Sequence, residues 1–293
     1  RDLDDVPAAC SHLLVLHEGR VVAAGPRDGV LANAEVARVL APPTLRFQPR
    51  PLTSGTPAMP ADGPTIALDG VTVSFGDLCV FRDLHWHFER GQHCLVAGPN
   101  GSGKSTLLDL LTGDNSKAYG QPVSLFGQRR GSGESIWEIK ARFGRVDARM
   151  QNAIPSGSTA LDVVCSGFFD SLGLYDRPSD RQKTLAREWL ESLGLAAQGT
   201  TEFATLSFGL QRLVLLARAM VKEPPILLLD EATLNLDAGH RRLFLAAVDH
   251  LIDAGHTQLL FVSHTAADRP RCINQLLEFA PGPGGSTVSV RNL

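Results

Sequence analysis

The sequence predicts an α/β fold, in which helices connect the parallel strands of a sheet. Strand-like and helix-like stretches alternate from Thr65 onward. Residues Ile226–Leu229 form a fully apolar run, as expected for a strand in the middle of a parallel sheet. A glycine-rich turn, Gly98–Thr106, follows the short apolar run Cys94–Ala97 and opens onto Leu107–Leu111, which is typical of the start of a buried helix.

The glycine-rich turn contains Gly98, Pro99, Asn100, Gly101, Ser102, Gly103, Lys104, Ser105 and Thr106. Its glycines allow backbone N–H groups to turn inward around an anion, and the following helix directs its positive dipole end to the same place. Lys104 supplies a cation for the β- and γ-phosphates of a nucleotide, and Ser105 supplies a hydroxyl for Mg²⁺. The pattern therefore predicts a phosphate-binding P-loop. A chance match in an ordinary turn is the alternative, whereas a dinucleotide fingerprint would need glycine at Thr106.

The composition is that of a globular protein without a membrane-spanning segment. Of the 293 residues, 43% are hydrophobic and 20% are charged, and the formal net charge is −3. The lack of bulk positive charge argues against nucleic acid as a partner. Every apolar run is shorter than the ~20 residues that cross a bilayer. Five scattered cysteines indicate reduced thiols. We expect a cytoplasmic protein, held at the inner face of the cell membrane only through a partner.

The N-terminal part contains two different patterns. Strand-like runs at His12–Leu16 and Val21–Ala24 predict a hairpin, and a short helix is expected around Val30–Leu40. Residues 1–40 are too few to bury a core on their own. Residues 41–64 contain seven prolines and few apolar residues, which predicts a stiff, extended linker.

The remaining residues, 65–293, predict one complete domain. Further strands are expected at Thr65–Phe75, Leu84–Phe88, Pro122–Phe126, Gln258–Val262, Ile273–Phe279 and Thr287–Val290. Helices are expected at Leu161–Phe169, Arg181–Leu193, Leu210–Lys222 and Ala238–Ala254. The chain begins with Arg1 rather than Met, so we expect it to be a piece of a longer protein.

Polar side chains follow two of the apolar strands. Asp230 and Glu231 come directly after Ile226–Leu229, and Ser263 and His264 follow the strand at 258–262. Ligands gather at the carboxyl ends of parallel strands. We expect Asp230 to hold Mg²⁺ and Glu231 to orient the attacking water or accept its proton. We expect His264 to contact the γ-phosphate. An acidic helix cap is the alternative for the carboxylates, and a structural role is the alternative for the histidine.

The segment Leu206–Gly209 precedes the helix expected at Leu210–Lys222. Ser207 and Gly209 suit a helix N-terminus that offers free N–H groups to an anion. An ordinary capped helix is the alternative.

Together these motifs resemble those of an ABC-type nucleotide-binding domain. The matching segments are Gly98–Thr106 for Walker A, Leu206–Gln211 for the signature, Leu229–Glu231 for Walker B, Leu236–Asp237 for the D-loop and Ser263–His264 for the H-switch. They occur in the family's order. The resemblance implies a P-loop NTPase fold with an ABC-type helical subdomain and an antiparallel β subdomain.

The same resemblance implies roles for individual residues. Phe75 matches the aromatic residue that stacks on adenine. Ser105 and Asp230 match the residues at Mg²⁺, and Lys104, Glu231 and His264 match the catalytic residues. The residues that match the signature, which acts on the ATP of a partner domain, are Leu206, Ser207, Phe208, Gly209, Leu210 and Gln211. Asp237 matches the D-loop aspartate. ATP and Mg²⁺ are the implied cofactors. The implied partners are a second ABC domain and a membrane permease.

Residues 1–40 resemble the C-terminal end of a preceding ABC domain, so the chain looks like a remnant, a linker at 41–64 and a complete domain at 65–293. Val163–Tyr175 and Leu206–Ala219 resemble the tandem-domain ATPases of molybdate-transport type, the ModF-like group. This implies an ATP-hydrolysing transporter subunit that serves import of an oxyanion such as molybdate.

Several positions depart from the family pattern. Ala148 stands where the Q-loop glutamine is usual, and Gln151 lies three residues further on. Phe208 and Leu210 replace the commonest signature residues, glycine and glutamine. These departures motivate an alternative function, an ATP-dependent regulatory or interaction module with weak or no hydrolysis. Two further alternatives are a permease-free ATPase acting on ribosomes or nucleic acid, and a non-functional fragment.

Overall fold

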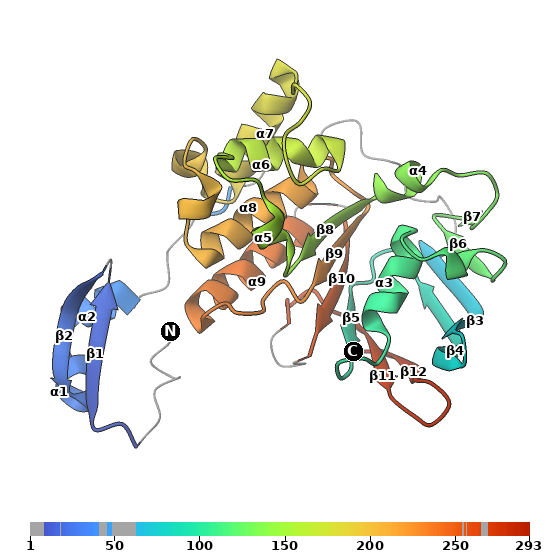
Figure 1. Cartoon of the computed structure of the whole chain (residues 1–293), viewed down its shortest axis with the longest axis horizontal. Helices are drawn as coiled ribbons and strands as arrows, with labels where there is room; N and C mark the ends of the chain where they lie inside the picture. The colour runs from blue at the N-terminus through green and yellow to red at the C-terminus, as the bar shows by residue number, and fades with distance from the viewer. Residues whose placement is uncertain are drawn as a thin grey trace.

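The computed structural model describes residues 9–17, 19–40, 46–48, 63–253, 255, 257–264 and 269–293. Its centre is a six-stranded sheet with the order β12-β11-β5-β10-β9-β8 (Figure 1). The strands are β5 (Cys94–Ala97), β8 (Phe143–Asp147), β9 (Ile226–Asp230), β10 (Gln258–Ser263), β11 (Gln275–Ala280) and β12 (Thr287–Asn292). Neighbouring strands from β11 to β8 are parallel, and β12 pairs antiparallel with β11. The α/β fold predicted from the sequence is therefore confirmed.

Strand β9 shows why this sheet is stable. All five of its residues are buried. Ile226 and Leu228 belong to one apolar core, which includes helix α3 (Lys104–Thr112). Leu227 and Leu229 belong to a second core on the opposite face. Because successive side chains of a strand point to opposite faces, a continuous apolar run is what a strand covered on both faces requires.

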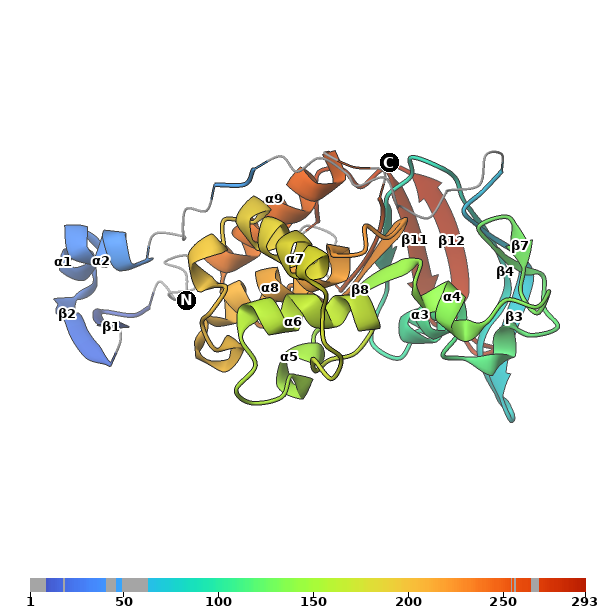
Figure 2. The ribbon, with the colours of Figure 1, turned by 90° about the horizontal axis from the view of Figure 1, so that it is seen from above.

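A smaller antiparallel sheet with the order β4-β3-β6-β7 shares the core of α3. Its strands are β3 (Ile66–Phe75), β4 (Leu78–Phe88), β6 (Val123–Leu125) and β7 (Gln128–Arg129). The short helices η2 (Ser116–Ala118) and α4 (Ile136–Lys140) flank β6 and β7 in the chain. Figure 2 shows this sheet at the opposite end of the domain from the helices α6, α7 and α9.

The second core lies under a group of helices. These are α5 (Met150–Ala153), α6 (Ala160–Ser166), α7 (Asp180–Ser192), α8 (Phe208–Met220) and α9 (Ala238–Asp253). Helices α6 and α7 each begin with a capping box, formed by Thr159 with Asp162 and by Ser179 with Gln182. Each box satisfies N–H groups that the first helical turn leaves unpaired. The helical part thus has well-defined starting points along the sequence.

Some elements differ from the sequence expectations. The helix expected at Leu161–Phe169 is α6 followed by the 3₁₀ helix η3 (Gly167–Phe169), and the strand expected at Leu84–Phe88 is the second half of β4. Strand β8 was not predicted, because Gly144 and Arg145 interrupt its apolar pattern. A Cβ at Gly144 would lie 2.4 Å from the Ala219 carbonyl oxygen, so glycine allows α8 to pack closely on β8.

The N-terminal residues form a small unit that stands apart from the domain in both ribbon views (Figures 1 and 2). The predicted hairpin is present as β1 (His12–His17) and β2 (Arg20–Pro26). The single helix expected around Val30–Leu40 is two helices, α1 (Arg27–Leu31) and α2 (Ala34–Leu40).

Most of the linker expected at 41–64 lies outside the described residues. Within it, Phe47 stacks on His250 of α9 with 5.5 Å between ring centroids. The backbone N–H of Gln48 donates to the Ser192 carbonyl oxygen at 2.9 Å. The chain is therefore attached at this point to the ends of α7 and α9. In the described part of the chain, we find no helix with the length and apolar character needed to cross a bilayer.

Candidate nucleotide-binding site

The P-loop connects the end of β5 to the start of α3. Gly98, Gly101 and Gly103 have φ angles of 148°, 75° and 105°, in the region that favours glycine. Space is equally restrictive, because a Cβ at Gly98 would lie 2.7 Å from the Phe279 carbonyl oxygen and one at Gly103 would lie 2.7 Å from Val80 Cγ1. The loop is thus held tightly between β11 and β4 in a conformation that other residues would strain.

Two polar side chains of the loop face inward. The Lys104 ammonium donates to the carbonyl oxygens of Gly98 and Pro99, at 2.8 Å each. Burial lowers the pKa of Lys104, and the nearby carboxylates of Glu231 and Asp230 partly oppose this shift. The Ser102 hydroxyl is buried and has no hydrogen-bond partner in the described part of the protein. A buried unsatisfied donor beside a cation fits an anionic ligand such as a phosphate.

Glu231 and His264 face each other across the carboxyl ends of β9 and β10. His264 Nε2 contacts Glu231 Oε1, and His264 Nδ1 lies 3.4 Å from the Gly98 carbonyl oxygen. Glu231 has a φ of 51°, a left-handed conformation that is costly for a residue with a side chain. The pair lines a hollow of about 150 Å³ together with Leu234, Asn235 and Arg241. A carboxylate and an imidazole beside the P-loop can together position a water and exchange a proton.

Asp230, the last residue of β9, lies beside Asp147, the last residue of β8. Burial raises the pKa of Asp230 to about 6, and the negative charge of Asp147 adds to this shift while Arg145 opposes it. Arg145 Nη2 lies 3.4 Å from Asp147 Oδ2 and 3.9 Å from Asp230 Oδ2. The edge of the sheet therefore holds an excess of negative charge that a divalent cation would relieve.

We expect Asp230→Asn to stabilise the metal-free protein at alkaline pH. The pKa of this carboxyl is higher in the folded than in the unfolded chain, so its contribution to stability is present below pH ~4 and is lost as the pH rises through about 6. The asparagine variant avoids this loss, which is on the order of 2–3 kcal/mol. Thermal unfolding in EDTA should show a gain of several degrees at pH 8 that shrinks toward pH 5. The exposed Asp176→Asn is the control, and an equal gain at both pH values would contradict the expectation.

The signature segment lies at the start of α8. The Ser207 hydroxyl accepts a hydrogen bond from the Leu210 N–H at 3.4 Å, and the Phe208 side chain is half exposed. A Cβ at Gly209 would lie 1.9 Å from the ring of His240 on α9. His240 is itself held by Asp237, through Nδ1 to Oδ2 at 2.7 Å and through its N–H to Oδ1 at 2.8 Å. The structure thus joins the signature glycine to the D-loop aspartate through one imidazole.

Gln151 does not reach the P-loop. It lies on α5, is buried, and donates from Nε2 to Oε1 of Gln211 in the signature segment. Gln211 donates in turn to the Phe203 carbonyl oxygen at 2.9 Å. Near the Q-loop position, the carbonyl oxygens of Asp147 and Ala148 accept from Arg212 at 3.1 Å each. A buried arginine on α8 therefore holds the end of β8.

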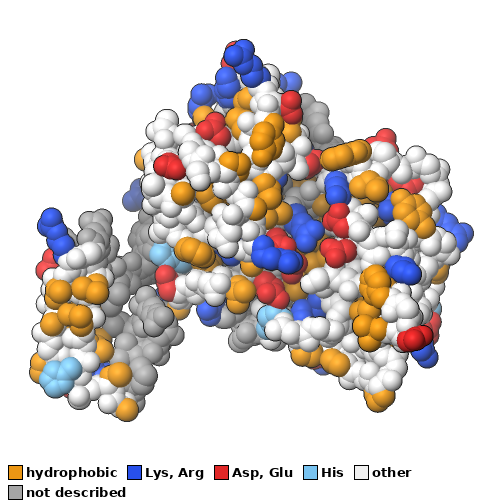
Figure 3. Space-filling view, viewed as in Figure 1, with side chains coloured by type: hydrophobic (Ala, Val, Ile, Leu, Met, Phe, Trp, Pro, Cys, Tyr) orange, Lys and Arg blue, Asp and Glu red, His pale blue; other side chains and the backbone are white. Residues whose placement is uncertain are grey.

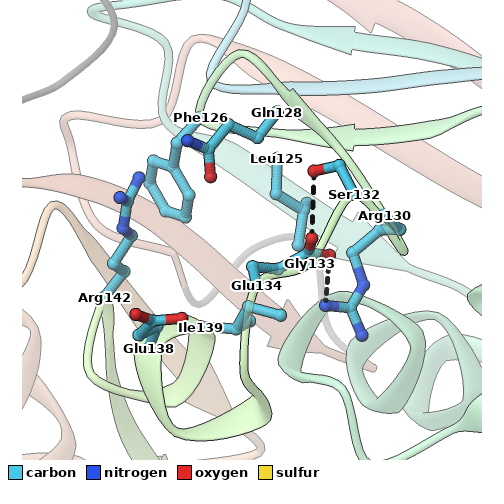
Figure 4. A pocket seen from close by; sticks show the side chains of 10 residues that line it. All are labelled: Leu125, Phe126, Gln128, Arg130, Ser132, Gly133, Glu134, Glu138, Ile139 and Arg142. Atoms are coloured by element: carbon cyan, nitrogen blue, oxygen red, sulfur yellow. Dashed lines mark hydrogen bonds and ion pairs between the residues drawn. The ribbon is translucent and has the colours of Figure 1, made fainter.

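Phe75 lies at the end of β3, half exposed, with the Lys117 ammonium 5.9 Å from its ring centroid. The ring belongs to the same sheet whose β4 packs against the P-loop. A separate hollow of about 390 Å³ lies between Phe126 and α4 (Figure 4). Its Glu134 carboxylate already accepts from Arg130, Ser132 and the Gly131 N–H. This hollow is larger than the one beside the P-loop, and the hydrogen bonds to Glu134 lie within the protein.

The sequence interpretation missed Asp147, Arg145 and His240. The rule that placed Asp230 at a strand end applies equally to Asp147, but β8 was not recognised as a strand. His240 is three residues past Asp237 at the start of a helix, and its packing on Gly209 depends on the tertiary structure.

Comparison with known proteins agrees with this arrangement. The family model described as ABC transporter matches residues 81–234. The ABC transporter ATP-binding protein ModF of Escherichia coli is 41% identical over 285 residues, which are 96% of this chain and 58% of that protein. The chain thus spans little more than half the length of this relative.

Shorter relatives and a solved structure cover the same region. The manganese transport system ATP-binding protein MntB of Bacillus subtilis is 30% identical over 233 residues, covering 78% of this chain and 90% of that protein. The structure of cbiO1 from Clostridium perfringens, part of an ABC transporter complex, has a TM-score of 0.68 at 19% identity, covering 79% of this chain and 89% of that one. That likeness confirms the fold, a P-loop NTPase domain with helical and antiparallel β parts. The chain belongs to the ABC transporter ATP-binding family.

Proposed function

We propose that this chain binds and hydrolyses ATP as the nucleotide-binding subunit of an ABC transporter. The observation that supports this most directly is the meeting of three side chains at one edge of the sheet. Lys104 lies inside the P-loop, Glu231 follows β9 and His264 follows β10, within contact of Glu231 and of the P-loop carbonyl. Phosphoryl transfer to water needs this combination of phosphate binding and water positioning.

The residues at this edge also fit Mg²⁺. Ser105 is exposed at the start of α3, and Asp230 ends β9 with an excess of neighbouring negative charge. Hydroxyl and carboxylate oxygens suit this ion, which usually keeps few protein ligands and takes the rest from phosphates and water. No larger cluster of His, Cys, Asp or Glu able to hold a metal occurs among the described residues. When bound, Mg²⁺ would neutralise charge on the phosphates during transfer.

A second ABC domain is the proposed partner at the site. Among the residues that the structure describes, no hydrogen bond connects Leu206–Gln211 with the P-loop. That segment contacts α5, α9, its own helix and the Phe203 carbonyl oxygen. A signature segment without a hydrogen bond to the P-loop of its own chain is available for another domain's nucleotide, as the family resemblance implies. We further propose that residues 1–40 are the end of a preceding ABC domain. The match of 285 residues to a relative of greater length supports this.

We propose an oxyanion such as molybdate as the transported ion, with a membrane permease as partner at the cytoplasmic face. The resemblance to the ModF-like group and the 41% identity to ModF support this. The relative named for manganese transport shares the ATPase domain at 30% identity. The domain alone therefore does not determine the ion, and uptake assays with permease candidates are the appropriate test.

A second candidate is an ATP-dependent interaction module with weak or no hydrolysis. One position supports this candidate, because Gln151 is used in a buried bond to Gln211 and Ala148 has no polar group that could bind a metal. ATP turnover equal to that of Glu231→Gln, with ATP binding intact, would favour this module over the ATPase.

We expect Lys104→Ala to weaken ATP binding strongly. Its ammonium is placed inside the P-loop to meet the β- and γ-phosphates, and a buried charge-assisted contact of this kind contributes about 2–3 kcal/mol, or roughly 30- to 150-fold in affinity. Isothermal titration calorimetry with ATP measures this directly. Lys183→Ala, on the exposed face of α7, should bind like the wild type. Unchanged ATP affinity in Lys104→Ala would contradict the proposed site.

A further inference from the structure

Arg145 lies between the nucleotide site and a second cavity. On one side, its Nη2 atom faces the carboxylates of Asp147 and Asp230, at 3.4 and 3.9 Å. On the other side, its Nη1 atom lies 3.5 Å from Asp114 Oδ2 and 4.0 Å from Asp109 Oδ1. Its side chain is three-quarters buried. One guanidinium is therefore shared among carboxylates from α3, the turn after it, and the ends of β8 and β9.

Asp114 lines a cavity of about 250 Å³. Lys140, Arg145, Met150, Asp170 and Arg218 also line it. The Asp114 carboxylate is bound by the Thr112 hydroxyl at 2.9 Å and the Lys140 ammonium at 2.6 Å, in addition to Arg145. Figure 3 shows charged side chains of both signs gathered in the middle of the face on which β8 lies. The Arg145 guanidinium thus pairs both with Asp114 in the cavity and with Asp230, the proposed metal ligand.

We propose that Arg145 is a positioning residue that links the Mg²⁺ affinity of the nucleotide site to the cavity at Asp114. The inference rests on the proposed role of Asp230 at the metal. Arg145 and a divalent cation would compete for the Asp230 carboxylate, because Arg145 already pairs with one of the two oxygens that could hold the cation. Asp114 draws the guanidinium toward the cavity and so reduces this competition. A partner that changes the charge at Asp114 changes metal binding at Asp230 without touching it.

Arg145 makes a connection that the polar or apolar residues just after β8 do not make. Ala148 has no polar side chain, and Gln151 is committed to Gln211. Arg145 lies three residues before Ala148 on the same strand end, and its guanidinium reaches both the Asp230 carboxylate and the cavity. Arginine suits this role because its planar group can pair with more than one carboxylate at a time.

The test is a titration of bound Mn²⁺ by electron paramagnetic resonance, in the presence of a non-hydrolysable ATP analogue. We expect Asp114→Asn to weaken Mn²⁺ binding by roughly three- to fivefold, since the released guanidinium pairs more strongly with Asp230. Arg145→Met should tighten Mn²⁺ binding. In the Arg145→Met background, Asp114→Asn should shift Mn²⁺ binding no more than a matched control does.

The matched control is Asp170→Asn. Asp170 lines the same cavity but pairs with Lys222, and its left-handed backbone conformation suits asparagine. The Asp170→Asn substitution therefore removes one negative charge from the same cavity and leaves the ion pairs of Arg145 in place. Equal shifts for Asp114→Asn with and without Arg145 would overturn the inference and leave the proposed function intact. Failure of the wild-type chain to bind Mn²⁺ with the analogue would overturn both.

Discussion

Glu231→Gln is expected to reduce ATP hydrolysis by about 100-fold or more while ATP binding remains. The amide keeps the size of the side chain and can still bond His264 Nε2, but it cannot accept a proton from water. Because the signature of one domain would close the P-loop of another, blocked hydrolysis should also retain ATP between two chains. Light scattering should then show a dimer with ATP and Mg²⁺, and a monomer with ADP.

The control for this result is Glu191→Gln on the exposed face of α7, which should hydrolyse ATP like the wild type. A Glu231→Gln protein that binds ATP but remains monomeric would rule out the two-chain site for this protein. Wild-type turnover in the same variant would instead remove Glu231 from the catalytic residues.

Gly209→Ala is expected to reduce ATP hydrolysis by about 100-fold without changing the ATP affinity of the chain's own P-loop. The added Cβ would overlap the His240 ring, 1.9 Å from Cδ2 and 2.4 Å from Cγ, so either α8 or the imidazole must move. Moving the imidazole also moves Asp237, to which it is bonded. A displacement of about 1 Å in a catalytic constellation can have an effect of this size. Steady-state ATPase assays and ATP titrations separate the two quantities.

The double variant Gly209→Ala with His240→Ala tests the cause. Without the imidazole, the new methyl group has room, so the loss of stability should be smaller than the sum of the two single losses by about 0.5–3 kcal/mol. Chemical denaturation of the four proteins gives this coupling. Additive losses would show that the alanine at position 209 acts through something other than His240.

The sequence was most informative where chemistry depends on consecutive residues. The P-loop needs its glycines, lysine and serine at fixed spacing, and Ile226–Leu229 is apolar because both faces of β9 are covered. These features predicted the fold and the edge of the sheet at which Lys104, Glu231 and His264 meet. The assigned roles of these residues remain predictions for the experiments above.

What the sequence did not reveal depends on contacts between distant segments. Gln151 was considered for the missing Q-loop glutamine by proximity in the chain, but its amide is buried against Gln211, sixty residues away. Strand β8 was hidden by Gly144 and Arg145, whose suitability is evident only beside α8 and Asp230. Neither pairing leaves a periodic signal in a single sequence.

The attachment of Phe47 and Gln48 to His250 and Ser192 has a consequence for the geometry of the chain. From Leu40 to Arg46 the backbone can reach at most about 20 Å, whatever path it takes. The N-terminal unit is therefore joined by a short tether to the end of the domain that carries the helices. A domain joined to that unit would meet this one at an effective concentration on the order of millimolar. Its encounter with the signature helix would then be governed by orientation rather than by diffusion.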